Sequence, residues 1–283
     1  MHLDPSFDAH VRRVDATAAA ALIDEGAVVL DVRTPDEFTG LGHIPGALLL
    51  PVQLVPCAPA VLRDPDAPVL VCCEHAVRSR TATRLLAQAG FTRVHELAGG
   101  MAGWQGPRAY DPAPVTGPSA WLVDNADLLP PGGRALDVAC GAGRHALLLG
   151  AAGFAVTAVD RDNAALTVLQ AQADRLGLTV QTRQADLERA DVDLGDAGYD
   201  LIVVTRYLHR ALMPHLLLSL APGGVLLYET FLIGQAERGH PTNPAFLLEP
   251  GELPALVQPL RILRQFEGDI DGALMSAVVA RRQ

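Results

Sequence analysis

The chain has 283 residues, 49% of them apolar and 19% charged, with a formal net charge of -10. Because a domain typically holds about 100–200 residues, this length predicts two domains, and the apolar content is high enough for two hydrophobic cores. The acidic balance argues against nucleic acid or an anionic membrane as a partner, since both attract basic surfaces.

The start of the chain and its cysteines indicate where in the cell the protein is expected and whether a metal site is expected. No apolar run approaches the length of about 20 residues that a membrane-spanning helix needs. The first residues carry charges and Pro5 rather than the apolar core of a secretion signal, so we expect a cytoplasmic protein. Four irregularly spaced cysteines predict neither a disulfide framework nor a Cys-x-x-Cys zinc site, and we expect no metal.

Short apolar runs alternate with helix-like stretches in the first part of the chain. Residues 28–32, 69–73 and 94–97 are expected strands and residues 81–89 an expected helix, which predicts a small α/β domain over residues 1–106. Residues 107–118 contain Pro107, Pro112, Pro114 and Pro118, which disfavour both helix and central strand. We expect them to be a linker.

Residues 119–283 begin with the pattern of a doubly wound parallel sheet. An expected strand at 135–139 enters a glycine-rich turn and an Ala/Leu-rich helix, and a second expected strand at 154–160 ends on an acid. Later expected strands lie at 201–205, 225–230 and 274–280. The pattern predicts a Rossmann-like α/β domain.

Cys73 stands between an apolar strand and a helix, so we expect it at a helix N-terminus. Amide donors and the positive end of the helix dipole stabilise a thiolate there, and Arg78 adds positive charge or binds an anion. The same curl of amides can hold a persulfide. Cys73 and Arg78 are therefore the predicted catalytic residues of the first domain.

These residues and their surroundings resemble the rhodanese family. Residues 30–33 with Glu37, and the Gly-His-Ile-Pro-Gly-Ala stretch at 42–47, are similar to its upstream motifs, and residues 97–100 with Trp104 to its closing motif. The resemblance implies that Cys73 carries sulfur from a sulfane-sulfur donor and that Arg78 ends the active loop, with Asp31 and Arg33 serving the scaffold.

Two departures from the rhodanese pattern keep a second interpretation open. Glu74 places a carboxylate beside the expected thiolate, and a nearby acid opposes ionisation of a thiol. Ala76 replaces a glycine that often relaxes this loop. Both favour a non-catalytic docking or sensing domain, whereas the presence of Cys73 and Arg78 opposes it.

The second domain opens with a nucleoside-binding pattern. Gly141 and Gly143 follow a strand that contains Asp137, and glycines in such a turn let the backbone approach a ligand closely. Asp160, at the end of the next strand, can accept hydrogen bonds from both ribose hydroxyls. An acid at Asp137 holds a cationic amino-acid moiety and repels a pyrophosphate, which favours S-adenosylmethionine over a dinucleotide.

This turn resembles motif I of class I S-adenosylmethionine-dependent methyltransferases, with Ala139 in place of the first glycine. The resemblance continues in residues 184–187, whose acid meets the adenine amino group, and in residues 199–204 and 220–227. The residues assigned to the cofactor are Asp137, Ala139, Gly141, Gly143, Asp160, Arg161, Asp186, Leu187 and Thr205.

The methyl acceptor is expected at the carboxyl ends of the fourth and fifth strands of this domain. His209 is the expected proton acceptor, and the expected acceptor-binding residues are Arg206, Tyr207, Arg210, Glu229 and Asn243. Asn243 belongs to a turn-rich segment, residues 239–248, that we expect to be a lid or an acceptor-binding insertion. This segment and residues 229–231 resemble the tellurite-resistance branch of small-molecule methyltransferases.

The two halves together predict an S-adenosylmethionine-dependent methyltransferase that acts on a small thiol, sulfide or other chalcogen. In this hypothesis the rhodanese-like domain carries or relays sulfane sulfur. The alternative is an O- or N-methyltransferase of a small metabolite, joined to a non-catalytic rhodanese-like domain.

Overall fold

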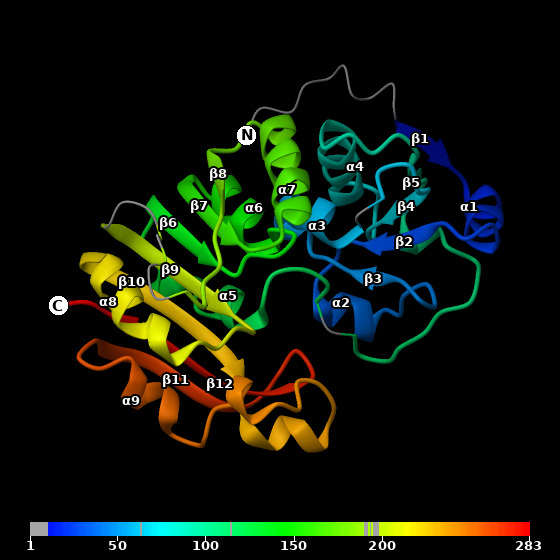
Figure 1. The fold of residues 1–283 in the computed structure, drawn as a ribbon. Coiled ribbons are helices and arrows are strands. Elements are labelled where there is room, and N and C mark those ends of the chain that lie inside the picture. The colour runs from blue at the N-terminus through cyan, green and yellow to red at the C-terminus, as the bar shows by residue number, and fades with distance from the viewer. Residues whose placement is uncertain (1–10, 63, 114, 190–191, 193, 195–197) are drawn as a thin grey trace. The chain divides into compact units, whose positions relative to one another are not determined.

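The computed structural model describes residues 11–62, 64–113, 115–189, 192, 194 and 198–283. The chain folds into two compact units, Met1–Gly117 with Arg175–Gly177 and Pro118–Asp174 with Leu178–Gln283 (Figure 1). Residues 1–10 of the expected first domain and Pro114 of the expected linker lie outside the described residues. Among the described helices, none combines the length and apolar character needed to cross a membrane.

The first unit is built on a parallel five-stranded sheet in the order β1-β5-β4-β2-β3. Its strands are β1 (Val11–Val14), β2 (Val28–Asp31), β3 (Leu48–Leu49), β4 (Val69–Cys72) and β5 (Val94–Leu97). Its helices are α1 (Ala16–Asp24), α2 (Pro35–Gly40), α3 (Ala58–Leu62) and α4 (Arg78–Gln88). Every residue of β4 is buried, as the continuous apolar run predicts for a central parallel strand.

Local sequence fixes where the helices of this unit begin. The Thr34 hydroxyl accepts a hydrogen bond from the Glu37 amide, and the Glu37 carboxylate accepts one from the Thr34 amide, so a capping box starts α2. Helix α4 begins at Arg78, earlier than the apolar periodicity indicates. It starts immediately after the Cys73 loop and therefore presents its first amides to that loop.

The second unit has a seven-stranded sheet in the order β11-β12-β10-β9-β6-β7-β8. Its strands are β6 (Gly133–Val138), β7 (Phe154–Asp160), β8 (Val180–Gln184), β9 (Tyr199–Thr205), β10 (Leu220–Phe231), β11 (Arg261–Ile270) and β12 (Ala273–Arg281). Strands β6 to β10 pair in parallel, whereas β12 runs antiparallel to β10 and to β11. The α/β class and the doubly wound arrangement agree with the sequence prediction, whereas the antiparallel pairing of β12 makes the sheet mixed, which the sequence did not predict.

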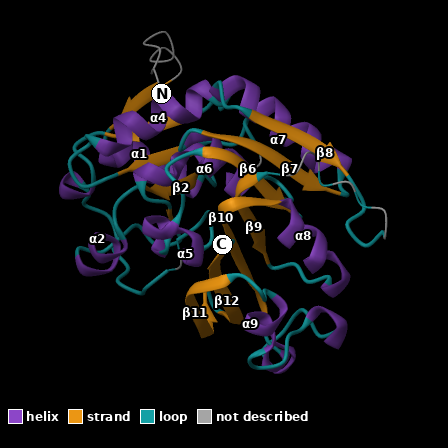
Figure 2. Ribbon diagram, turned by 90° about the vertical axis from the view of Figure 1, so that its left-hand side faces the viewer, coloured by secondary structure: helices purple, strands orange, loops and turns teal. Residues whose placement is uncertain are grey.

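Helices cover both faces of this sheet (Figure 2). They are α5 (Ala120–Asp124), α6 (Arg144–Ala151), α7 (Asn163–Leu176), α8 (Met213–Ser219) and α9 (Glu252–Leu256). Met213 and Leu216 of α8 and Leu253 of α9 share one buried cluster with Ile202 and Val204 of β9. The chain reverses its direction of winding between β6 and β9, and a crevice at the carboxyl ends of such strands is where open α/β sheets bind ligands.

Candidate active sites

Cys73 lies in the turn between β4 and α4, with its side chain buried. The backbone amide of Ser79 donates a hydrogen bond to Cys73 Sγ at 3.2 Å, as expected for a sulfur at the start of a helix. The amides of Met101 and Ala102 donate to the carbonyl oxygens of Cys73 and Glu74 at 2.8 and 3.1 Å. The rhodanese-like closing motif therefore holds the backbone of the active loop.

This close contact explains the glycine at position 100. A Cβ at Gly100 would collide with the carbonyl oxygens of Cys73 and Glu74, and the φ of this residue is +63°. Ala76, in the middle of the loop, has a φ of +55°, a conformation that costs an L-residue about 1–2 kcal/mol. The loop therefore keeps, at Ala76, a backbone turn suited to glycine.

The sequence suggests that the Glu74 carboxylate opposes a thiolate at Cys73, but in the structure this carboxylate is paired with an arginine. Its Oε2 accepts a hydrogen bond from Arg33 Nη1 at 2.7 Å. The Arg33 side chain is fully buried and also binds both carboxylate oxygens of Asp31 and the Gly42 carbonyl. The charge of Glu74 is therefore compensated, which weakens the expectation that it opposes a Cys73 thiolate.

Arg78 closes the loop through an ion pair. Its two terminal nitrogens bind the two carboxylate oxygens of Glu37, at 2.7 and 2.5 Å. The Arg78 guanidinium, aided by the Thr34 hydrogen bonds and opposed by burial, lowers the pKa of Glu37 to about 2. The neighbouring Cys72 belongs to the core, and burial raises the pKa of its thiol. Of these two adjacent cysteines, only Cys73 belongs to the active loop.

In the second unit, the turn after β6 depends on left-handed backbone. Ala139, Gly141 and Gly143 have φ values of +56°, +53° and +82°. A Cβ at Gly143 would collide with the side chain of Leu169 of α7, so glycine is required there for packing. A Cβ at Gly141 would have no neighbour within 4 Å, so the space beside this backbone is open to a ligand.

Asp160, at the end of β7, fixes this turn. Its carboxylate accepts hydrogen bonds from the Gly141 amide at 2.8 Å and from the Asp162 amide at 2.9 Å. Each carboxylate oxygen has a second lone pair, and the side chain also lines the cavity described below. Asp160 is thus held in place for hydroxyl donors that enter the cavity.

Asp137 is the most unusual ionisable group of this unit. Its side chain is 1% exposed, and neither carboxylate oxygen receives a well-formed hydrogen bond from the described residues. Burial raises its pKa to about 7, against the opposing influence of the Ala146 amide and the Arg144 guanidinium. A buried carboxylate without a good partner is costly, so this position suits a cationic group of a ligand.

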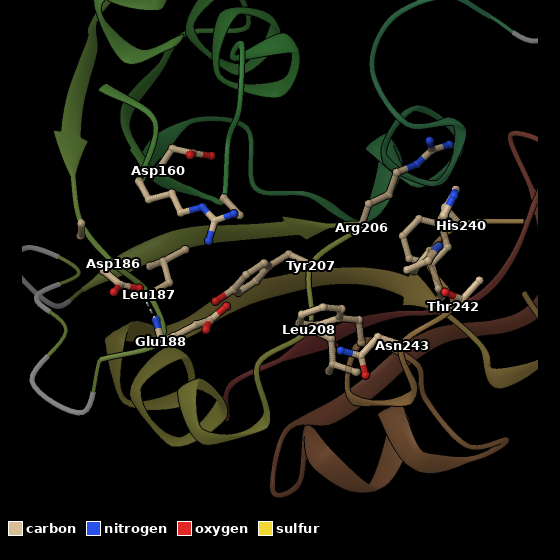
Figure 3. A pocket seen from close by; sticks show the side chains of 16 residues that line it. Asp160, Asp186, Leu187, Glu188, Arg206, Tyr207, Leu208, His240, Thr242 and Asn243 are labelled. Atoms are coloured by element: carbon tan, nitrogen blue, oxygen red, sulfur yellow. Dashed lines mark hydrogen bonds between the residues drawn. The ribbon is translucent and has the colours of Figure 1, made fainter. Parts of the chain in front are cut away.

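A cavity of about 790 Å³ opens next to the turn, within the usual size of small-molecule sites. Its lining includes these predicted site residues: Ala139, Asp160, Arg161, Asp186, Leu187, Arg206, Tyr207 and Asn243. Figure 3 shows Asp160, Asp186 and Glu188 on one side of the cavity and His240, Thr242 and Asn243 on the other. The Tyr207 ring points toward Glu188 (Figure 3), and burial raises the pKa of its phenol to about 12.

Several predicted site residues lie elsewhere among the described residues. Those not in the cavity lining are Asp137, Gly141, Gly143, Thr205, His209, Arg210 and Glu229. Arg210 binds both carboxylate oxygens of Glu252 and the carbonyls of Ala245 and Leu247, so it anchors the turn-rich segment. Glu229 is buried, and burial raises its pKa, against the Ser119 hydroxyl and nearby guanidiniums.

Thr205 faces the opposite side of the sheet from α8, next to a buried histidine of α6. The Ser119 amide donates to His145 Nε2 at 3.1 Å, so the proton of the neutral ring is assigned to Nδ1, which lies 3.4 Å from the Thr205 hydroxyl. Burial lowers the pKa of His145 to about 3, which keeps the ring neutral. Thr205 therefore supports the α6 side of the turn.

The cavity lining also contains residues to which the sequence analysis gave no individual role. These are Ala185, Glu188, Leu208, Phe231, His240, Pro241, Thr242 and Phe246. His240 is the important addition, because it is the imidazole in this lining, whereas His209 is not part of it. His240 belongs to the turn-rich segment that the sequence analysis expected to be a lid or an acceptor-binding insertion, and this could have pointed to it.

Comparison with known proteins finds a different family in each of two parts of the chain. The family model for the rhodanese-like domain matches residues 15–107, and the model for the tellurite resistance protein TehB matches residues 113–224. The chain therefore joins a rhodanese-like domain to a TehB-family methyltransferase domain. This confirms the predicted resemblance and fold class.

The rhodanese-like domain has close relatives among thiosulfate sulfurtransferases named GlpE. That of Pseudomonas entomophila is 39% identical over 95 residues, which cover 33% of this chain and 84% of the relative. That of Stutzerimonas stutzeri is 35% identical over 94 residues, with 33% and 84% covered. The chain belongs to the rhodanese family through this domain.

The methyltransferase domain shares the fold of TehB from Haemophilus influenzae. The two structures superpose with a TM-score of 0.50 at 22% sequence identity, over 57% of this chain and 61% of that one. The chain thus spans less than two thirds of the TehB structure. At 22% sequence identity this similarity is evidence for a shared fold alone.

Proposed function

We propose that the methyltransferase domain transfers the methyl group of S-adenosylmethionine to a small thiol, sulfide or other chalcogen, and that Cys73 carries sulfane sulfur. The observation on which the proposal rests is the turn after β6. Left-handed backbone at Gly141 leaves open space, and Asp160 is fixed beside a cavity of about 790 Å³. Family membership supports the same cofactor.

The residues of the site fit S-adenosylmethionine. Asp160 is placed to accept the ribose hydroxyls, and Asp186, whose Oδ1 already accepts the Glu188 amide, to meet the adenine amino group. Asp137 supplies a buried negative charge for the α-amino group, which explains why it lacks a well-formed hydrogen bond among the described residues. When bound, the cofactor supplies an electrophilic methyl group on a sulfonium.

The acceptor would occupy the other side of the cavity. Phe231 and Phe246 give that side apolar surface, and His240 is the candidate to accept a proton from the acceptor. Hydrogen sulfide ionises to hydrosulfide near neutral pH, and a free thiol ionises at about pH 8.5. Such an acceptor therefore needs only a weak base and placement of its lone pair in line with the methyl group. This modest set of polar groups therefore suits a chalcogen acceptor.

In the rhodanese-like domain, the thiolate of Cys73 would attack the outer sulfur of thiosulfate. The S–S bond of thiosulfate breaks, sulfite leaves with the electron pair, and Cys73 becomes a persulfide. The Ser79 amide and the loop backbone held by Met101 and Ala102 support this role. The ion pair of Glu74 with Arg33 weakens one of the two arguments for a non-catalytic domain.

Calorimetry with S-adenosylhomocysteine tests the cofactor assignment. Asp160→Ala should weaken binding by roughly 1.5–3 kcal/mol for each hydrogen bond to the carboxylate that is lost. Asp162→Ala, which removes a neighbouring carboxylate outside the cavity lining, is the matched control. Unchanged affinity in Asp160→Ala would refute the assignment.

Release of S-adenosylhomocysteine in the presence of sulfide, small thiols, selenite or tellurite tests the acceptor class. We expect turnover with at least one of these compounds. Turnover with oxygen or nitrogen acceptors alone would favour an O- or N-methyltransferase.

A further inference from the structure

Three buried side chains form a hydrogen-bonded series behind the active loop: Cys73, Ser79 and Glu96. Cys73 Sγ lies 3.4 Å from Ser79 Oγ, and Ser79 Oγ lies 3.2 Å from Glu96 Oε1. Their exposed fractions are 1%, 0% and 3%. The proposed sulfur transfer uses Cys73 and the backbone amide of Ser79. It gives no role to the Ser79 hydroxyl or to the Glu96 carboxylate.

The direction of these hydrogen bonds follows from the chemistry of the groups. An ionised carboxylate only accepts, so the single hydroxyl proton of Ser79 is donated to Glu96. The Ser79 oxygen then turns only lone pairs toward Cys73. It can accept a hydrogen bond from the thiol, but it cannot donate one to a thiolate.

The backbone of Ser79 has the opposite effect. Its amide lies 3.2 Å from Cys73 Sγ and stabilises negative charge on the sulfur. Ser79 thus makes two contacts with the sulfur, one favouring the thiolate and one favouring the thiol. The second depends on what Glu96 does with the hydroxyl proton.

Glu96 is held in this orientation from its other side. Strands β1 and β5 pair with Arg13 opposite Glu96, and Arg13 Nε lies 3.5 Å from Glu96 Oε2. One carboxylate oxygen therefore faces Arg13 and the other faces Ser79. This division fixes which oxygen receives the Ser79 proton.

Other titratable groups lie on the segments that form the Cys73 loop and its ion pairs, namely the end of β2, α2, β4 and the active loop with the start of α4. They are Asp31, Arg33, Glu37, Cys72, Glu74, His75 and Arg78. The carboxylates and guanidiniums in this set are ion-paired with one another, Asp31 and Glu74 with Arg33, and Glu37 with Arg78. Glu96 differs from them because it reaches the sulfur through a hydroxyl whose orientation it controls.

We propose that Glu96 is a positioning residue that holds Cys73 as a thiol in the resting protein, by drawing the Ser79 hydroxyl proton to itself. The inference rests on the proposed role of Cys73 as sulfur carrier and adds a means of restraining it. Cys73 then reacts through a minor thiolate population, which also protects the resting sulfur from oxidation. Sulfur loading is accordingly faster at higher pH.

Glu96→Gln tests the inference in the full chain. The glutamine oxygen stays with Arg13, so its NH2 group faces Ser79 and donates, and the Ser79 hydroxyl is released to donate to the thiolate. The readout is the rate of iodoacetamide alkylation at Cys73 against pH, followed by peptide mass spectrometry. The midpoint should fall by about one pH unit, with alkylation about tenfold faster at pH 7. A midpoint equal to or above that of the wild type would overturn the inference.

The Ser79→Ala background separates this mechanism from the direct field of the carboxylate. Without the hydroxyl, Glu96→Gln should leave the alkylation profile unchanged. An equal downward shift in both backgrounds would show that Glu96 acts through space and not through Ser79, and would also overturn the inference.

Arg13→Gln, at a side chain that is 56% exposed, tests the same series of groups if Glu96→Gln fails to fold. A carboxylate released from Arg13 accepts more strongly from Ser79, so the midpoint should rise. An unchanged or lower midpoint would contradict the inference. Alkylation needs no sulfur donor, so failure of Cys73 to take up sulfur from thiosulfate would refute the carrier role and leave the alkylation result intact.

Discussion

Two alanines adopt a backbone conformation that glycine adopts without strain, one in each active loop. Ala76 and Ala139 have φ values of +55° and +56°. In both cases the residue stands at a position where the resembled family has glycine. The surrounding hydrogen bonds, of Met101 and Ala102 in one loop and of Asp160 in the other, enforce the turn despite its cost.

Ala139→Gly should therefore stabilise the methyltransferase domain. Relief of left-handed strain gains about 1–2 kcal/mol, and the larger entropy of an unfolded glycine offsets about 0.4–1 kcal/mol of this. We expect a net gain of up to about 1.6 kcal/mol. Urea unfolding followed by Trp121 fluorescence in a Trp104→Phe background measures it, since the chain has two tryptophans.

Ala142→Gly is the matched control in the same turn. Ala142 is not among the residues with positive φ, so glycine should destabilise there by about 0.5–1 kcal/mol. Equal effects of the two substitutions would contradict a role for strain at Ala139.

Substitution of His240 and substitution of His209 should have different effects on catalysis. His240→Gln should lower kcat for a thiol acceptor by at least about tenfold below neutral pH, because the acceptor loses its proton acceptor. The loss should shrink at high pH, where the thiol ionises unaided. His209→Gln should leave the pH–rate profile near that of the wild type, and the reverse pattern would restore His209 as the base.

At the scale of elements, ion pairs join the segments that form the Cys73 loop. Arg33, which follows β2, binds Asp31, the Gly42 carbonyl and Glu74. Arg78, at the start of α4, binds Glu37 of α2. Arg33 is fully buried and bonded on several sides, so removing it would leave the buried carboxylate of Asp31 unpaired. The Arg78–Glu37 pair is partly exposed and is the one to test by pH.

Glu37→Gln should destabilise the rhodanese-like domain in a pH-dependent way. The folded-state pKa of Glu37, about 2, lies below its usual value near 4.5, so the ion pair contributes fully above about pH 4.5. Its contribution, at most about 1 kcal/mol for a partly exposed pair, is lost as pH falls toward 2.

The measurement is the difference in urea midpoint between wild type and Glu37→Gln across this pH range. Asp36→Asn, on the same helix and without an ion pair among the described residues, is the control and should show little pH-dependent difference. A difference between Glu37→Gln and wild type that stays constant down to pH 2 would show that the ion pair does not stabilise this domain.

At the scale of the whole molecule, two domains with separate cores share one chain. One buried cluster includes Phe38, Leu70 and Trp104, and another includes Ile202, Leu226 and Leu253. A chain of this kind is useful for coupled chemistry if sulfur loaded on Cys73 reaches the methyltransferase site before it escapes. Short linkers hold tethered sites at about millimolar effective concentration.

Coupling is tested with full-length chains alone. Wild type is compared with an equimolar mixture of Cys73→Ser and Asp160→Ala chains, at about micromolar concentration and with equal numbers of intact sites. If transfer occurs within one chain, methylated sulfur from thiosulfate should appear at least about tenfold faster in the wild type. Equal rates would mean that sulfur passes through solution between independent domains.

The strands that the sequence did not reveal share one property. They are β1 (VRRV), β3 (LL), β8 (VQTRQ) and β11 (RILRQFEGDI), which all lie at sheet edges and each have exposed or half-exposed residues. An edge strand pairs on one side and faces solvent on the other, so it needs no continuous apolar run. The central strands, buried on both faces, carry such runs and were predicted.

The sequence by itself determined both domain types and both loops, because their motifs are local. Cys73 follows β4, Gly141 follows β6 and Asp160 ends β7, and parallel strands bring their carboxyl ends to one edge of a sheet. Contacts between distant segments were decided only by the tertiary structure. Glu74 meets Arg33 across 41 positions of sequence, and strand register alone places Arg13 opposite Glu96.

Only the tertiary structure distinguishes His240 from His209 as the candidate proton acceptor. His209 follows β9 directly, where sequence reasoning looks for a base, but its ring does not line the cavity. His240 lies in a long connection after β10, and only the packing of that connection brings it to the cavity. Proximity along the chain fixes the backbone of a loop, whereas the side chains that meet there depend on how the remaining elements pack around it.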